Sequence, residues 1–137
     1  MPDAVALAAL HAACFTLPRP WTASEITALR DSPHVFMIRE SGGFLMGRAV
    51  AGEAELLTLA VSPDLRRLGM GRRLVHTFQT EAAARGATSA FLEVAASNFP
   101  AVALYERAGF TPVGRRKGYY KGQNGAQDDA VIMSCTL

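Results

Sequence analysis

The sequence predicts a single α/β domain in which helices pack on a mixed β-sheet. The chain has 137 residues, which is the size of one compact domain. Half of its residues are hydrophobic, enough for one core, and 19% are charged, which argues against wholesale disorder. Segments with the two-residue period of strands alternate with segments that have the 3.6-residue period of helices. We therefore expect residues 1–137 to form one domain with helices on the faces of a mixed sheet.

The N-terminal part of the chain predicts two helices followed by three antiparallel strands. Asp3 can cap a helix that runs from about residue 4 to residue 15. The segment Thr22-Ala-Ser-Glu25 has the spacing of a capping box, so a second short helix should begin there. Apolar, β-prone segments follow at residues 34–39, 44–51 and 53–61, with glycine-containing turns between them.

The remaining chain alternates helices and strands. A third helix is expected to end at Gly86, and a strand should follow at residues 89–95. A fourth helix is expected from Asn98 to Gly109. The last two strands are expected at residues 110–116 and 130–136, joined by a long, polar, glycine-rich hairpin tip. One face of the third helix is apolar and consists of Leu74, Val75, Phe78 and Ala82.

Composition excludes several classes of function. The net charge of +2 is too small to indicate nucleic-acid binding. No apolar run reaches the roughly 18 residues of a membrane span, and the start lacks the basic region of a signal peptide, so the cytoplasm is the expected location. Cys14 and Cys135 are too few for a metal cage, and we expect both to be small buried apolar residues.

The segment from Arg66 to Arg72, here called the arginine–glycine turn, follows a strand and begins a helix. The first free N–H groups of a helix attract anions, and glycines let a phosphate approach the backbone closely. The Arg-x-x-Gly-x-Gly spacing differs from both the dinucleotide fingerprint and the P-loop. The pattern by itself predicts a phosphate site, with a solvated basic helix start as the alternative.

With its neighbours, this turn resembles the acyl-CoA pyrophosphate loop of the GNAT acetyltransferase superfamily, whose pattern is Arg/Gln-x-x-Gly-x-Gly/Ala. The preceding segment, residues 59–63, resembles the strand end whose backbone pairs with the pantetheine arm of the cofactor. The segment from Asn98 through Tyr105 to Phe110 resembles the second cofactor helix of the family. The resemblance extends from about residue 33 to the end of the chain.

This resemblance implies a GNAT-like fold, with a mostly antiparallel sheet of about six to seven strands and about four flanking helices. The first edge strand of the family is expected to be short or missing here. Acetyl-CoA is the implied co-substrate, and no metal is implied. The implied cofactor-binding residues are Leu59, Ala60, Val61, Arg66, Arg67, Leu68, Gly69, Met70, Gly71, Arg72, Asn98 and Tyr105.

Within the superfamily, the chain is most similar to the ribosomal-protein-alanine N-acetyltransferase (RimI) family. Four segments show this: Leu92-Glu93-Val94-x-x-Ser97-Asn98, Pro20-Trp21-Thr22, Arg116-x-x-Tyr119-Tyr120, and residues 129–133. The resemblance implies acetylation of the N-terminal alanine of a small-subunit ribosomal protein, and it gives Trp21, Tyr119 and Tyr120 as candidate substrate contacts. For the tyrosines, an ordinary aromatic hairpin edge is the alternative.

Two residues are candidates for proton transfer, which amide formation from a protonated amine requires. Glu93 is a carboxylate on an apolar strand, sharing a face with Phe91 and Ala95. Tyr105 is a phenol that can donate a proton to a leaving thiolate. The resemblance implies that Glu93 is the proton acceptor, directly or through water, and that Tyr105 is the donor. The alternatives are a rim glutamate paired with an arginine and a core tyrosine.

Three functions remain from the sequence. The leading one is direct transfer of acetyl to a ribosomal protein N-terminus in a ternary complex, since no Cys or Ser is placed as an acyl carrier. The second is the same chemistry on a small amine, an amino acid or a lysine. The third is a non-catalytic acyl-CoA-binding module, which the presence of both Glu93 and Tyr105 disfavours. A monomer and a weak homodimer are both compatible with the sequence.

Overall fold

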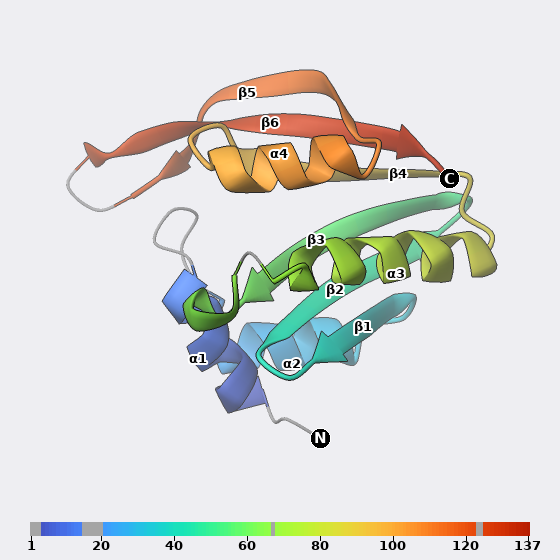
Figure 1. The fold of residues 1–137 in the computed structure, drawn as a ribbon, viewed down its shortest axis with the longest axis horizontal. Coiled ribbons are helices and arrows are strands. Elements are labelled where there is room, and N and C mark those ends of the chain that lie inside the picture. Colours follow the sequence, from blue (N-terminus) through green and yellow to red (C-terminus); the bar gives the residue numbers. More distant parts are fainter. Residues whose placement is uncertain (1–3, 15–20, 67, 123–124) are drawn as a thin grey trace.

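The computed structural model describes residues 4–14, 21–66, 68–122 and 125–137, and all of these belong to one sheet with its flanking helices (Figure 1). The helices are α1 (Ala4–Cys14), α2 (Ala23–Arg30), α3 (Met70–Ala84) and α4 (Phe99–Arg107), and a 3-10 turn, η1 (Pro63–Leu65), precedes α3. The strands are β1 (Val35–Glu40), β2 (Gly43–Val50), β3 (Glu53–Val61), β4 (Ser89–Ala95), β5 (Thr111–Lys121) and β6 (Gln127–Thr136).

The six strands form one sheet in the order β1-β2-β3-β4-β6-β5. All neighbouring pairs are antiparallel except β3 and β4, which are parallel. The predicted mixed sheet with four flanking helices is therefore confirmed. Within the described residues the first element is α1.

Local sequence signals fix the ends of the helices. Thr22 accepts the backbone N–H of Glu25 at 3.2 Å, and the Glu25 carboxylate accepts the backbone N–H of Thr22 at 3.0 Å, which completes the predicted capping box. Gly86 and Gly109 adopt left-handed φ values of 92° and 96° directly after α3 and α4. Glycine takes this conformation without steric cost, so both helices end where the sequence predicts.

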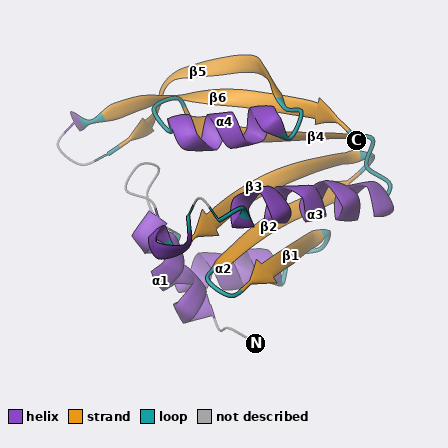
Figure 2. Ribbon diagram, viewed as in Figure 1, coloured by secondary structure: helices purple, strands orange, loops and turns teal. Residues whose placement is uncertain are grey.

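The helices cover the two faces of the sheet differently. The predicted apolar face of α3 is buried: Leu74, Val75, Phe78 and Ala82 are each 1% exposed or less. Helix α3 packs together with α4 on one face of the sheet. Helices α1 and α2 pack on the other face, over β1, β2 and β3. In the ribbon diagram α3 and α4 lie in front of the strands, and α2 lies behind them (Figure 2).

The parallel strands β3 and β4 pair only at one end. Their ladder consists of Glu53 with Ser89, Ala54 with Ala90 and Glu55 with Phe91. Beyond these residues β3 pairs only with β2, and β4 pairs only with β6. The two strands therefore separate towards their carboxyl ends, which is where ligands bind in open α/β sheets.

A β-bulge in β3 reorients the strand where it separates from β4. Met46 of β2 pairs with Thr58, and the next residue, Gly47, pairs with Leu56, so Leu57 is the extra residue. Leu56 packs with α3, whereas Leu57 packs in the cluster under α1 and α2. A regular two-residue alternation fails to predict this change of face.

The C-terminal hairpin differs from its prediction. Residues 117–121 and 127–129 were expected in a polar tip, but they belong to β5 and β6, with Lys121 paired to Gln127. Their side chains are mostly exposed, and the strands form because backbone pairing needs no apolar residues. The hairpin is irregular in its middle. Arg116 pairs with Ala130 and Tyr120 pairs with Asp128, so the three residues of β5 between these pairs, 117–119, lie opposite the single residue Asp129 of β6.

Candidate functional site

A cleft of about 400 Å³ lies where β3 and β4 separate. Its walls come from α1, Trp21 in the segment before α2, β3, β4, α4 with its N-cap Asn98, and β5. The lining residues are His11, Trp21, Glu55, Leu56, Leu57, Thr58, Leu59, Glu93, Val94, Ala95, Asn98, Ala101, Tyr105, Tyr119 and Tyr120. Five elements and Trp21 thus meet at one cavity.

All five residues that the sequence predicted as catalytic or substrate-binding lie on this cleft. They are Trp21, Glu93, Tyr105, Tyr119 and Tyr120, and the predicted cofactor residues Leu59 and Asn98 lie there too. Ala60 and Val61 do not line the cleft, since Ala60 is 1% exposed under α1 and α2 and Val61 packs towards α3. These two residues can contribute backbone groups to a ligand.

Glu93 combines a place on the cleft with an arginine partner. Its Oε1 lies 3.3 Å from Nη2 of Arg116, and its side chain is 25% exposed. The Arg116 guanidinium also lies 5.1 Å from the ring centroid of Tyr119. Glu93 therefore fits both interpretations from the sequence: it is a carboxylate on the cleft, and it is paired with an arginine.

The two phenols of the cleft both keep their protons at neutral pH. Burial raises the pKa of Tyr105, which is 6% exposed, well above its ordinary value, and the neighbouring Tyr120 adds to the shift. Burial, followed by the negative charge of Glu93, raises the pKa of Tyr120 to about 12. Both side chains can consequently act as hydrogen-bond donors towards a bound group.

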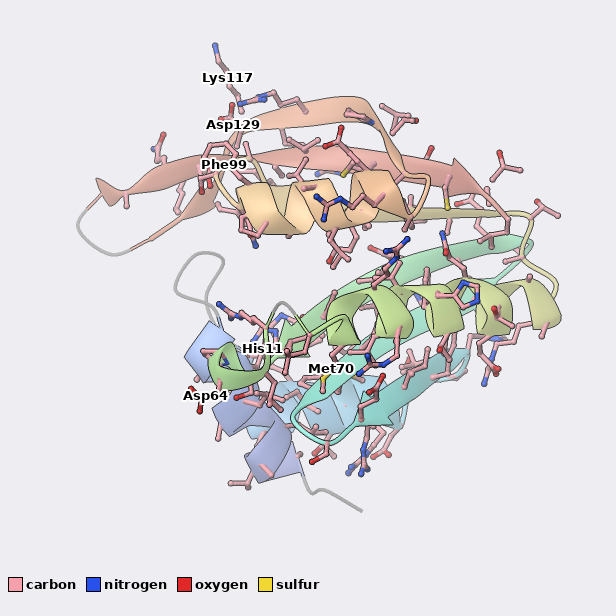
Figure 3. All side chains as sticks on the ribbon, in the orientation of Figure 1. His11, Asp64, Met70, Phe99, Lys117 and Asp129 are labelled. Atoms are coloured by element: carbon pink, nitrogen blue, oxygen red, sulfur yellow. The ribbon has the colours of Figure 1, made fainter. Side chains whose placement is uncertain are left out.

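Hydrogen bonds around Asp129 shape the part of the hairpin that holds the tyrosines. Its carboxylate accepts the backbone N–H of Gly118 at 2.8 Å and Nε of Arg115 at 2.7 Å. These bonds hold the pKa of Asp129 below its usual value. Gly118 has a positive φ of 57°, which a glycine tolerates. Next to it, the rings of Tyr119 and Tyr120 lie edge to face with 5.2 Å between their centroids. Figure 3 shows Asp129 and, further out, Lys117 at this end of the sheet.

The arginine–glycine turn leads into α3, as predicted. Gly69 has a left-handed φ of 85° at the N-cap and makes no side-chain cap, and the first turn of α3 contains no acidic residue. Gly71 allows α3 to approach α4, because a Cβ there would lie 3.1 Å from Leu104. The side chain of Met70 is buried with 8% exposure, so only its backbone can contact a ligand. Arg67 lies outside the described residues.

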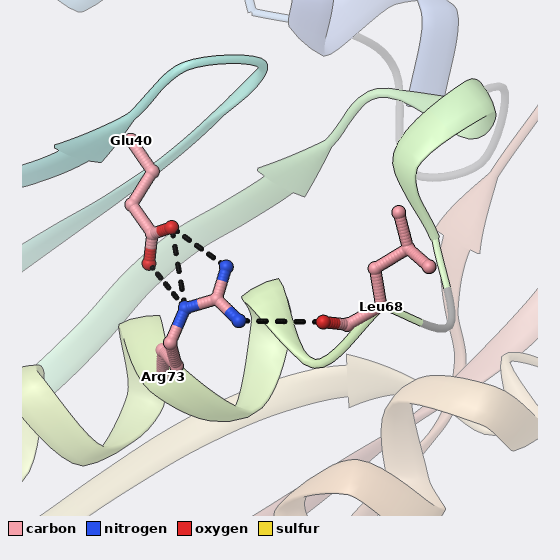
Figure 4. A network of polar contacts seen from close by, with 3 residues as sticks. All are labelled: Glu40, Leu68 and Arg73. Carbon is pink, nitrogen blue, oxygen red and sulfur yellow. Dashed lines mark hydrogen bonds and ion pairs between the residues drawn. The ribbon is translucent and has the colours of Figure 1, made fainter.

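The arginines of this region have different environments. Arg66 donates Nε to the backbone carbonyl of Val61 at 3.2 Å. Arg73, just beyond the turn, forms an ion pair with Glu40 at 2.8 Å and donates Nη1 to the carbonyl of Leu68 at 3.3 Å (Figure 4). The hydrogen bonds from Arg73 to its carboxylate keep the pKa of Glu40 below its usual value. Arg72 is exposed and has no ion pair within the described parts of the chain. Arg73 therefore links the turn to β1, whereas Arg72 remains available for a ligand.

His11 is a cleft residue that sequence reasoning missed. It is 1% exposed, stacks on Trp21 with 5.1 Å between ring centroids, and its Nε2 lies 2.8 Å from Oγ1 of Thr58. The backbone N–H of Trp21 donates to its Nδ1 at 3.0 Å. Burial lowers the pKa of His11 to about 4. The one signal in the sequence is the position of His11 on the apolar face of α1, which alone predicts an ordinary core histidine.

Other classes of site find little support. Among the described residues, no group of three or more His, Cys, Asp or Glu side chains could hold a metal ion. Within the same residues, no helix is long and apolar enough to span a membrane. Cys135 is a free, buried cysteine, as expected, and the side chain of Cys14 lies outside the described part.

The chain is similar to known acetyltransferases. The family model described as "Acetyltransferase (GNAT) family" matches residues 4–110. The ribosomal protein bS18-alanine N-acetyltransferase of Escherichia coli K12 is 35% identical over 122 residues, which cover 86% of this chain and 82% of the relative. The enzyme of the same name from Salmonella typhimurium is 42% identical over 94 residues, covering 69% of this chain and 63% of the relative.

Solved structures show the same likeness. The crystal structure of the ribosomal-protein-S18-alanine N-acetyltransferase from Escherichia coli superposes with a TM-score of 0.86 at 30% identity, covering 98% of this chain and 88% of that one. The fold also matches Arabidopsis thaliana NAA60 in complex with acetyl-CoA, with a TM-score of 0.84 at 19% identity over 98% of this chain and 93% of that one.

Proposed function

The chain belongs to the GNAT acetyltransferase family and is an N-acetyltransferase, and from this premise we propose that it acetylates the N-terminal alanine of a small-subunit ribosomal protein. Enzymes of this family take the acetyl group from acetyl-CoA. One observation supports the proposal most: the separation of β3 and β4 opens a cleft with Glu93 and Tyr105 on its walls.

The donor binds along the carboxyl end of β3 and the start of α3. The free backbone N–H groups at the start of α3 attract the pyrophosphate, and the exposed Arg72 adds charge. The backbone of Leu59, Ala60 and Val61 pairs with the pantetheine arm. Asn98 caps α4 by accepting the N–H of Ala101 at 3.3 Å, and its amide nitrogen is left to hydrogen-bond the same arm.

The reaction is a direct transfer between the two bound substrates. The acceptor amine loses a proton to Glu93, directly or through water, and its nitrogen then attacks the thioester carbonyl carbon. The tetrahedral intermediate collapses, the bond between carbon and sulfur breaks, and the leaving thiolate takes a proton from Tyr105. The nitrogen that attacked loses its second proton, which returns the Tyr105 phenolate to the phenol. Burial keeps Tyr105 protonated until that step, which is the state a proton donor needs.

The acceptor enters between Trp21 and the β5–β6 hairpin. Tyr119 is 50% exposed and lines the cleft with Tyr120, so both rings are accessible to a peptide. A ribosomal protein as substrate would place the reaction in the cytoplasm. The sequence likeness to the alanine N-acetyltransferases favours an alanine N-terminus over a small amine or a lysine.

Mass spectrometry of ribosomal proteins incubated with the enzyme and labelled acetyl-CoA tests the substrate. We expect label on the N-terminal alanine of one small-subunit protein. A panel of Ala-initiated peptides, polyamines, amino acids and lysine peptides, assayed in parallel, gives kcat/KM for each class of acceptor. A higher kcat/KM for a free small amine than for the Ala-initiated peptide contradicts the proposed substrate.

A pair of glutamate variants tests the catalytic base. Glu93→Gln should lower kcat by about 10²-fold or more, the usual contribution of a general base. Glu55→Gln is the matched control, since Glu55 lines the same cleft, pairs with Arg48 at 2.7 Å and has the same 25% side-chain exposure. Equal losses in the two variants, or a pH–rate profile unchanged by Glu93→Gln, remove Glu93 from the mechanism.

A further inference from the structure

The hydrogen bonds of His11 determine where its proton lies. A backbone N–H is always a donor, so the bond from Trp21 makes Nδ1 of His11 an acceptor. The lowered pKa keeps the ring neutral at physiological pH, and a neutral imidazole has one N–H, which must then be on Nε2. Nε2 therefore donates to Oγ1 of Thr58 at 2.8 Å.

This assignment leaves the hydroxyl proton of Thr58 without an acceptor in the described structure. A hydroxyl has one proton and two lone pairs, and here one lone pair accepts from His11. Thr58 is 7% exposed, and among the described residues its hydroxyl has no other hydrogen-bond partner. A buried donor that stays unsatisfied destabilises the folded protein, so this one needs an acceptor.

The place of Thr58 indicates which substrate supplies that acceptor. The bulge at Leu57 puts Leu57 and Thr58 on the face covered by α1 and α2, together with His11 and Trp21. The start of α3, where the phosphates of the donor are proposed to bind, lies on the opposite face. Thr58 lines the cleft from the side of the acceptor.

We propose that the Thr58 hydroxyl donates a hydrogen bond to the first carbonyl oxygen of the acceptor, and that His11 is the positioning residue that turns this proton towards the cleft. This inference rests on the proposed function for the identity of the acceptor. It makes the carbonyl that follows the reacting amine a determinant of specificity, so that an amide or a peptide binds better than a plain amine of similar size.

The chain offers a direct probe of binding. Trp21 is the only tryptophan of the sequence, and it lines the cleft against His11. Its fluorescence reports binding of an acceptor whether or not transfer follows. The probes are an Ala-initiated peptide, alaninamide, and isopropylamine, which has the amine but no carbonyl. They are titrated into the protein with CoA bound.

Thr58→Val removes the hydroxyl and keeps the shape of the side chain. It should weaken the peptide and alaninamide by about 3- to 10-fold, which corresponds to one hydrogen bond, and leave isopropylamine and the KM for acetyl-CoA unchanged. Thr58→Ser keeps the hydroxyl and should restore binding. Equal weakening of all three probes, no weakening, or a Ser variant as weak as the Val variant overturns the proposal.

Two variants of His11 separate positioning from folding. The Nε2 of glutamine can replace the N–H that His11 donates to Thr58, whereas the Oδ1 of asparagine can replace only the acceptor for Trp21. His11→Gln should retain alaninamide affinity better than His11→Asn, at matched folding judged by Tm. The reverse order, or equal affinities, contradicts the positioning role. If wild-type protein binds alaninamide but does not prefer the peptide, the proposed substrate fails while this inference stands.

Discussion

Two regions, one proposed to bind the acceptor and the other proposed to bind the donor, are held together by different physical means. On the acceptor side, His11, Trp21 and Thr58, here called the His11 cluster, form a buried network of neutral hydrogen bonds and ring stacking. On the proposed donor side, the arginine–glycine turn is held by one exposed ion pair, Arg73 with Glu40, and a left-handed glycine, Gly69. Buried hydrogen bonds are protected from salt and water, whereas exposed ion pairs are weakened by both.

The difference teaches where each region is vulnerable. The His11 cluster depends on the protonation state of one ring, because a charged imidazole cannot accept the N–H of Trp21. The turn depends on backbone conformation at Gly69 and on the link between Arg73 and Glu40. Changes of pH should therefore affect the first region, and changes of salt or backbone should affect the second.

The largest expected effect is the loss of stability in mild acid that His11 causes. The pKa of His11 is about 4 in the folded protein, whereas the ordinary value of 6.5 applies to the unfolded chain. The unfolded chain therefore binds the proton more tightly than the folded protein. Stability therefore falls as the pH drops from about 6.5 towards 4, by roughly 3 kcal/mol from this group, and the slope vanishes below that range.

Thermal unfolding between pH 4 and pH 8 measures this effect. The control is His11→Asn, which should have a lower Tm at pH 7 but a weaker dependence of Tm on pH. Because imidazolium quenches a stacked indole, the fluorescence of Trp21 should change near pH 4 and stay constant above pH 5.5. A fluorescence change centred near pH 6.5 would contradict the buried, neutral His11.

The next largest effect is expected from Gly69→Ala in the turn. A left-handed conformation costs an L-residue about 1–2 kcal/mol, and here the strain falls on the N-cap of α3. We expect a lower Tm and about a tenfold higher KM for acetyl-CoA, with a smaller change of the KM for the acceptor.

Gly52→Ala is the matched control for the turn. Gly52 has nearly the same φ, 83° against 85°, and a Cβ there would meet nothing within 4 Å. It lies in the turn between β2 and β3, so the same strain should lower Tm without raising the KM for acetyl-CoA. If both variants raise this KM equally, the turn has no special place in donor binding.

The smallest effect is expected from Arg73→Ala. Its ion pair with Glu40 is exposed, so its loss should change Tm little. The variant should raise the KM for acetyl-CoA by about 1.5- to 5-fold at low salt, because Leu68 loses the bond that holds the turn. This rise should shrink in 0.5 M salt, where Debye screening already weakens the pair of the wild-type protein.

The exposed pair of Arg85 and Glu81 at the end of α3 provides the control. The two side chains lie 2.9 Å apart, distant from the turn. Glu81→Gln should leave the KM for acetyl-CoA unchanged at every salt concentration. A salt-independent KM in the wild-type protein would contradict the account of the turn as an electrostatic site.

The amino-acid sequence determined the order of the helices and strands and seven of the fifteen residues that line the cleft. The capping box at Thr22 and the glycines after α3 and α4 act locally, through backbone bonds within a few residues, so their effects can be read from the sequence. The apolar face of α3 and the strand position of Glu93 follow from periodicity. The motifs around Arg66, Asn98 and Tyr105 identified the family.

Tertiary structure alone decided how these elements meet. The bulge at Leu57 and the pairing of β3 with β4 at only three positions depend on contacts between strands, which no local pattern encodes. The extent of β5 and β6 depends on backbone pairing between polar residues. The partners of His11, Trp21 and Thr58, lie 10 and 47 residues away in sequence, so only long-range packing brings the buried ring to them.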